Sequence, residues 1–149
     1  MNEREDSRMT VKTPPEVVAF INTTERSDAQ ILRGIESLSV SADAKALLAD
    51  LLKLATRVGQ TLLLVGRKII DFALSLARAF PHLGFAALMA LVLTALVAMV
   101  PFIGMALASV LGPLALALGV AVGGAMDFQS PDLDSRVREF ASGFSGLAA

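Results

Sequence analysis

The dominant pattern along the chain is a stretch, residues 79–126, that contains no Asp, Glu, Lys or Arg. A membrane-spanning helix needs about 20 apolar residues, so residues 84–126 have room for two such helices. Pro101 and Gly104 lie near the midpoint and predict a turn between helices over 84–100 and 105–126. The sequence therefore predicts an all-α integral membrane protein built on a transmembrane helical hairpin. A hairpin that crosses the bilayer incompletely is an alternative, because the first arm is short.

Small residues recur at intervals of four along both predicted arms, a spacing that allows close helix packing in lipid. One such seam is expected to join the two arms, and another to join neighbouring subunits of a homo-oligomer. Pro113 is expected to kink the second arm structurally rather than to act as a gate hinge. The predicted packing residues are Ala86, Ala90, Thr94, Ala98, Ala108, Gly112, Ala115, Gly119 and Gly123.

The segment before the hairpin predicts one long amphipathic helix over residues 42–80, with Ser41 as its N-cap. Its polar residues fall mostly three or four positions apart, which indicates one narrow face. Gly59, Gly66 and Ala73 recur every seven residues and predict a seam where another backbone approaches closely. The polar stripe consists of Asp50, Lys53, Arg57, Gln60, Arg67, Asp71 and Arg78, with Lys68 and Ser75 beside them.

The two ends of the chain are more polar. Residues 1–12 are expected to be disordered, and residues 13–41 to form two short cytoplasmic helices, the second capped by Ser27. Residues 127–149 predict a short amphipathic tail that begins near Pro131. Its apolar face is expected to hold Leu133, Val137, Phe140, Phe144 and Leu147.

Composition agrees with a membrane location. Hydrophobic residues make up 54% of the chain and charged residues 18%, against about 25% charged in typical soluble domains. Trp and Tyr, the usual residues of the membrane interface, are both absent, which counts against this interpretation. Arg and Lys residues flank the uncharged stretch on both sides, so both termini are expected in the cytoplasm and the hairpin in the bacterial inner membrane.

The candidate chemistry is sparse. The chain has no Cys, which excludes disulfides and thiolate chemistry, and its net charge of −1 does not favour nucleic acid as a partner. Its single histidine, His82, follows Pro81 at the expected water boundary, where a helix-end role is favoured over a catalytic one. We expect neither an enzyme nor a cofactor or metal site.

Three functions fit this pattern. The favoured one is a self-associating membrane anchor or scaffold, in contact with the lipid bilayer and with a possible protein partner. The alternatives are an oligomeric pore or membrane-permeabilising effector, resembling holins or toxins, and a membrane-shaping wedge. In a pore, the stripe that includes Arg57, Gln60, Arg67 and Asp71 would line the lumen, although a stripe facing the cytosol is favoured. A soluble protein with a buried hairpin, as in colicin-like toxins, is disfavoured because few residues remain to cover it.

Overall fold

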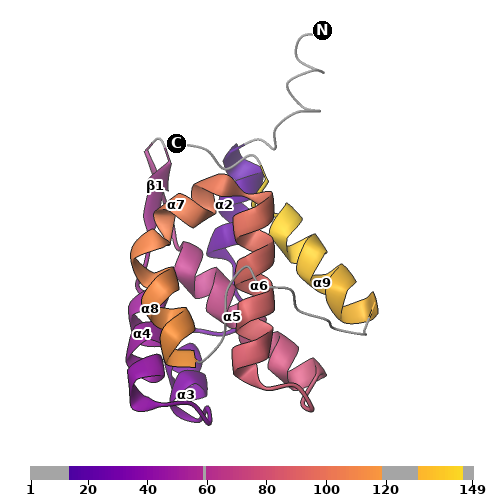
Figure 1. Cartoon of the computed structure of the whole chain (residues 1–149). Helices are drawn as coiled ribbons and strands as arrows, with labels where there is room; N and C mark the ends of the chain where they lie inside the picture. Colours follow the sequence, from indigo (N-terminus) through magenta and orange to yellow (C-terminus); the bar gives the residue numbers. More distant parts are fainter. Residues whose placement is uncertain (1–13, 59, 119–130, 146–149) are drawn as a thin grey trace, which may run out of the picture.

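The computed structural model describes residues 14–58, 60–118 and 131–145, which form a helical bundle with one small β-hairpin (Figure 1). The all-α class predicted from the sequence is confirmed in this coarse form. The helices are α2 (Pro14–Asn22), α3 (Asp28–Glu36), α4 (Ala42–Leu52), α5 (Val65–Ala79), α6 (Phe85–Met99), α7 (Pro101–Ala106), α8 (Ala108–Leu118) and α9 (Pro131–Ser142). The strands are β1 (Thr56–Val58) and β2 (Thr61–Leu63). Residues 1–12, expected to be disordered, lie outside the described residues.

Two of the helices begin at the predicted caps. The Ser27 hydroxyl accepts a hydrogen bond from the backbone N–H of Gln30 at 3.2 Å, and the Gln30 side chain accepts one from the Ser27 N–H at 2.9 Å. This reciprocal capping box satisfies two backbone donors at the start of α3. The Ser41 hydroxyl caps α4 by accepting a hydrogen bond from the backbone N–H of Ala44 at 3.1 Å. Local sequence therefore determines both helix starts.

Helix α5 lies at the centre of the bundle, with α2, α3, α4 and α6 packed around it. Its buried residues include Ile69, Ile70, Ala73 and Leu76. Its apolar residues face these neighbours, and its polar side chains meet the loop between α2 and α3. This helix is the frame on which the other elements are positioned.

The predicted long helix over 42–80 is wrong. Helix α4 ends at Leu52, and an antiparallel hairpin separates it from α5, with Val58 paired to Thr61 across a two-residue connection. The β-branched residues Thr56, Val58 and Thr61 favour strand over helix, and a glycine in the connecting pair is a typical hairpin signal. The chain thus reverses direction, and α4 packs against α5 instead of continuing into it.

Gly66 shows why the reversal is possible. A Cβ atom at this position would overlap the carbonyl group of Leu51, so α4 and α5 meet backbone against backbone. The Gly66 N–H also donates to the Leu54 carbonyl at 3.2 Å. The sequence correctly indicated a close approach at Gly66, and the approaching backbone belongs to the same chain.

The uncharged stretch also differs from a two-armed hairpin. Helix α6 matches the predicted first arm closely, but Pro101 begins the short helix α7, in which Gly104 lies, and α8 follows from Ala108. Proline is well suited to the first turn of a helix, where its missing N–H costs nothing, so Pro101 starts a helix after the break at Val100. Helix α8 packs mainly against α4, whereas α6 packs against α5 and α9. Within residues 84–118, α6 and α8 therefore pack mainly on other helices, and the part of the predicted seam at Gly119 and Gly123 lies outside the described residues.

The described helices can be compared with the thickness of a bilayer. Among residues 14–58, 60–118 and 131–145, no helix has both the length and the apolar character that crossing a membrane requires.

Helix α9 lies along α6 at the edge of the bundle (Figure 1). Its buried residues Leu133, Val137 and Phe140, with Phe144 just beyond it, are those predicted for the apolar face of the tail. Leu147, the fifth residue of that predicted face, lies outside the described residues.

Candidate functional site

The predicted helix-packing residues are distributed over several environments. Ala90 is buried in the bundle, Ala86 and Ala115 are half-buried, and Ala108 and Gly112 are exposed. Thr94 and Ala98 lie beside α9. Gly119 and Gly123 lie outside the described residues. Pro113 lies inside α8 and is exposed.

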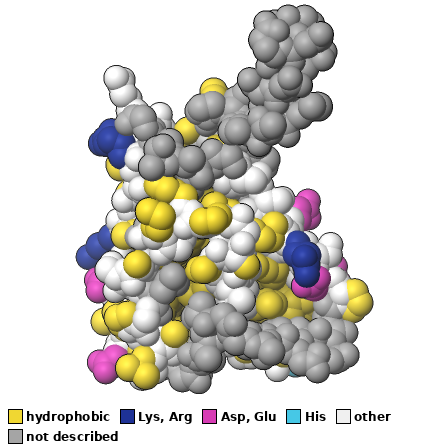
Figure 2. All heavy atoms as spheres, turned by 45° about the horizontal axis from the view of Figure 1, so that its top comes forward, with side chains coloured by type: hydrophobic (Ala, Val, Ile, Leu, Met, Phe, Trp, Pro, Cys, Tyr) yellow, Lys and Arg dark blue, Asp and Glu magenta, His cyan; other side chains and the backbone are white. Residues whose placement is uncertain are grey.

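An exposed and uncharged surface covers the end of α6, α7 and α8. Four of the six exposed large hydrophobic side chains among the described residues belong to this region, and the most exposed are Met105 at 74% and Leu116 at 83%. Figure 2 views the molecule with the α7 end turned forward, with hydrophobic side chains across the middle and charged ones toward the edges. The uncharged surface consists of Val97, Ala98, Met99, Pro101, Met105, Ala108, Ser109, Gly112, Pro113 and Leu116.

The packing of α8 explains this exposure. Leu114 is fully buried, but α8 has apolar residues on its other sides as well. An open groove of about 530 Å³ separates its outer part from α4 and is lined by Leu47, Pro113 and Leu116, among others. A helix that is hydrophobic all round calls for cover on every side, and among the described elements α8 packs mainly on α4.

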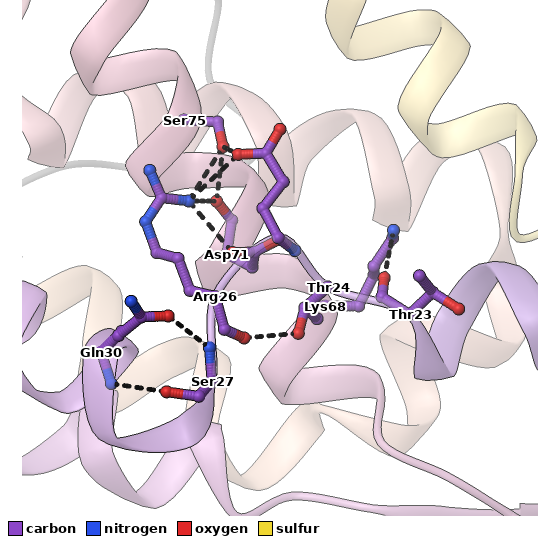
Figure 3. Close-up of polar contacts among 9 residues, drawn as sticks. Thr23, Thr24, Arg26, Ser27, Gln30, Lys68, Asp71 and Ser75 are labelled. Carbon is purple, nitrogen blue, oxygen red and sulfur yellow. Dashed lines mark hydrogen bonds and ion pairs between the residues drawn. The ribbon is translucent and has the colours of Figure 1, made fainter.

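The charged residues of α5 form a second feature, on the side of the bundle that faces the loop between α2 and α3 (Figure 3). Arg26 Nη1 donates to Asp71 Oδ1 at 3.0 Å and to Ser75 Oγ at 3.0 Å. The other carboxylate oxygen of Asp71 accepts the backbone N–H of Glu25 at 3.0 Å. The side chains of Arg26 and Asp71 are 11% and 5% exposed, so this is a buried ion pair with both carboxylate oxygens satisfied. We call Glu25, Arg26, Asp71 and Ser75 the polar clamp.

Two further basic residues of α5 hold the same loop. Arg67 donates to the Asn22 carbonyl at 2.7 Å and pairs with Asp28 at 3.2 Å. The Lys68 ammonium donates to the Thr23 carbonyl at 2.8 Å. Partial burial lowers the pKa of Lys68, and the nearby carboxylates of Asp71 and Glu25 oppose that shift. These contacts fix the loop to α5.

The predicted polar stripe is therefore not one continuous face. Asp50 belongs to α4, Lys53 follows it, Arg57 and Gln60 belong to the hairpin, and Arg67, Asp71 and Arg78 belong to α5. Arg78 is exposed, whereas Asp71 points into the bundle.

Sequence reasoning missed Arg26, the partner of Asp71. One signal was present, because a carboxylate flanked by Ile69, Ile70 and Ala73 lies in an apolar run and must find a partner if buried. Nothing in the sequence, however, links a residue 45 positions away to Asp71.

A cleft of about 720 Å³ lies between the polar clamp and α9. Its floor is aromatic, where the rings of Phe72 and Phe140 stack at 3.9 Å. Glu25, Lys68, Arg136 and Glu139 provide both signs of charge around it. Acidic and basic groups alternate here, so the cleft does not select a ligand by charge.

The described residues offer little chemistry for catalysis. Asp71 is fully engaged by Arg26 and the Glu25 N–H, and the exposed His82 lies against Phe80, with ring centres 6.3 Å apart. Within the part of the chain that the structure describes, no three His, Asp or Glu side chains gather as metal ligands would. Comparisons with protein-family models, curated proteins and solved structures gave no match for this chain. The uncharged surface is thus the feature that best indicates a function.

Proposed function

We propose that this chain is a non-enzymatic, membrane-associated helical bundle that contacts the bilayer through its uncharged surface. The observation that carries the proposal is the exposure of Met105 and Leu116, at 74% and 83%, on α7 and α8, two helices without a charged residue. Large exposed apolar side chains that gather on neighbouring helices typically mark a contact with a membrane or a protein. Lipid is favoured here because residues 79–126 lack Asp, Glu, Lys and Arg altogether.

The energetics favour this contact. Burial of one Leu or Met side chain contributes about 1.5–3 kcal/mol relative to its exposure in water. Val97, Met99, Met105 and Leu116 are each exposed, so each adds a contribution of this size where it reaches lipid. A neutral surface also avoids the penalty of bringing charged groups to the hydrocarbon region.

The dimensions favour an interfacial position. Helix α8 has 11 residues, which corresponds to a length of about 16 Å, against a hydrocarbon core of about 30 Å. Such a helix reaches into one leaflet. The proposal therefore places α7 and α8 in the membrane as a wedge, with charged residues such as Arg33 and Glu36 of α3 in water on the cytoplasmic side of the bacterial inner membrane.

Self-association is a second part of the proposal. Ala108 and Gly112 are exposed four residues apart on α8, and a Cβ atom at Gly112 would meet open space. In lipid, such a row allows a second helix to approach closely. For the pore-forming alternative, the polar stripe gives no support in this fold, because Asp71 is paired with Arg26 inside the bundle.

Flotation of the full chain with anionic phospholipid vesicles tests the membrane contact. Replacing both Met105 and Leu116 by Ser is expected to lower the bound fraction about tenfold or more, because two anchoring side chains are lost. The matched control is Leu32→Ser, which removes an exposed leucine from α3. Equal flotation of the double variant and the control, or no flotation of the unaltered chain, would refute the proposal.

A further inference from the structure

We propose that α9 is a displaceable cover of α6, which leaves α6 when the protein meets a bilayer so that the apolar faces of both helices turn to lipid. The inference rests on the proposed function and adds a conformational step to it. Three structural features lead to it: the apolar character of α6, the way α9 is held, and the gaps that border α9.

Helix α6 has no polar side. Apart from Thr94, all of its 15 residues are Ala, Val, Leu, Met or Phe. A helix of this kind needs cover around its whole circumference. Helix α5 covers one side, and α9 provides cover on another (Figure 1). Any departure of α9 therefore uncovers apolar surface on α6.

The contacts of α9 are compatible with release. Its buried face is apolar, formed by Leu133, Val137 and Phe140, so lipid can replace the contacts that this face makes. Its ion pairs join residues of α9 itself, and one of them links Arg138 to Asp134 at 2.8 Å. These pairs would survive when the helix moves. The loop between α2 and α3, in contrast, is tied to α5 by the buried pair of the polar clamp.

Helix α9 is bordered by gaps on two sides, one toward α6 and one toward α5. A groove of about 210 Å³ runs between α6 and α9, with Leu91, Ala95 and Val137 among its lining residues. Ala98 and Met99 line the same groove and also belong to the uncharged surface, so the groove opens where lipid is proposed to lie. The larger cleft of about 720 Å³ borders α9 on the side of α5. The larger cleft has charged walls, so acyl chains would reach the boundary between α6 and α9 through the smaller groove, past Asp134 and Arg138, which also line it.

Gly143, directly after α9, lies at a close contact between the end of α9 and α2. A Cβ atom at Gly143 would overlap the ring of Phe20, so the end of α9 sits directly on α2. Phe144 packs edge-on against the same ring, with centres 5.3 Å apart. One added methyl group at Gly143 is thus expected to weaken the closed arrangement without altering α6 or the uncharged surface.

The chain contains no Trp and no Cys, so an introduced Trp or Cys residue is a unique probe. Leu91→Trp places a single fluorophore on α6 beside the groove, and brominated phospholipid vesicles quench it if α6 reaches the acyl chains. Gly143→Ala in this background should reach half-maximal quenching at about tenfold less lipid, the size of effect typical of one overpacked group. Ser142→Ala, an exposed neighbour on α9, is the matched control and should leave the lipid dependence unchanged.

A cross-link between α6 and α9 has the opposite effect to Gly143→Ala, because it holds α9 on α6. Ala98→Cys and Arg138→Cys place two thiols on the groove, one on each helix, and a short bismaleimide joins them. The cross-linked protein should still float with vesicles, whereas its Trp fluorescence should no longer be quenched. Circular dichroism before vesicle addition verifies that each variant is folded.

The outcomes separate the two proposals. If no form floats, the proposed membrane contact fails, and the displacement of α9 fails with it. If the protein floats but the tryptophan is never quenched, or if cross-linked and open forms are quenched equally, the membrane contact stands and the displacement of α9 is refuted.

Discussion

Helices α6 and α8 are both apolar and lie close together in the sequence, yet their surroundings differ. Helix α6 has seven buried residues, including Leu88, Met89 and Leu93. Helix α8 buries Leu114 and leaves Leu116 83% exposed. The difference lies in their neighbours, because α6 lies between α5 and α9 whereas α8 packs mainly on α4.

The comparison extends to the charged residues around α6. On the α5 side of the bundle, even the charges are matched, as in the pair of Arg26 and Asp71. On the α8 side, Asp43 of α4 lines the groove beside Pro113 and Leu116, but α7 and α8 themselves carry no charged residue and leave apolar side chains exposed. The proposed membrane contact accordingly assigns a stabilising role to the α5 side and contact with lipid to the α8 side.

The largest loss of stability is expected on replacing Asp71, which forms the buried ion pair with Arg26. Asp71→Ala leaves Arg26 buried without its partner, which typically costs about 3–5 kcal/mol of unfolding free energy. Urea titration followed by circular dichroism measures this loss. Asp28→Ala is the control, since Asp28 forms a solvent-exposed pair with Arg67, and it should cost about 1 kcal/mol or less. Similar losses for both variants would show that the polar clamp is not important for stability.

The next prediction compares the stability lost on truncating one leucine in α6 with that lost on truncating one in α8. Leu93 is fully buried, so Leu93→Ala should lower the free energy of unfolding by about 2–5 kcal/mol, through lost burial and a residual cavity. Leu116→Ala, at a largely exposed position, should change it by about 0.5 kcal/mol or less. The same urea titration measures both. An equally large loss at Leu116 would mean that α8 is covered as well as α6 is.

The smallest effects concern two helical glycines and are expected to have opposite signs. Gly66→Ala should destabilise the protein by about 1–3 kcal/mol, because its methyl group would overlap the Leu51 carbonyl. Gly112→Ala should stabilise it by up to about 1 kcal/mol, since the methyl group meets open space and alanine favours helix. Thermal unfolding of both variants measures the shifts. If Gly112→Ala destabilises the protein, another part of the molecule must lie close to this position, against the prediction.

Much of the local structure could be predicted from the sequence. The capping box of Ser27 and Gln30 lies within four residues, and so does the spacing of Leu133 and Val137 on α9. The length of α6 also followed from the uncharged run and the break before Pro101. The hairpin between α4 and α5 was missed, because a helical spacing of polar residues outweighed the β-branched residues around it.

Residues a few positions apart set the starts of α3 and α4, the apolar face of α9 and the extent of the uncharged stretch, so these features could be read from the sequence. The tertiary structure decided that Asp71 meets Arg26, that α8 lies on α4 and that α6 is covered by α9. Those contacts join residues tens of positions apart, and hydrophobicity is non-directional, so an apolar run does not specify its neighbour. The same apolar character therefore became a core in α6 and an exposed surface in α8.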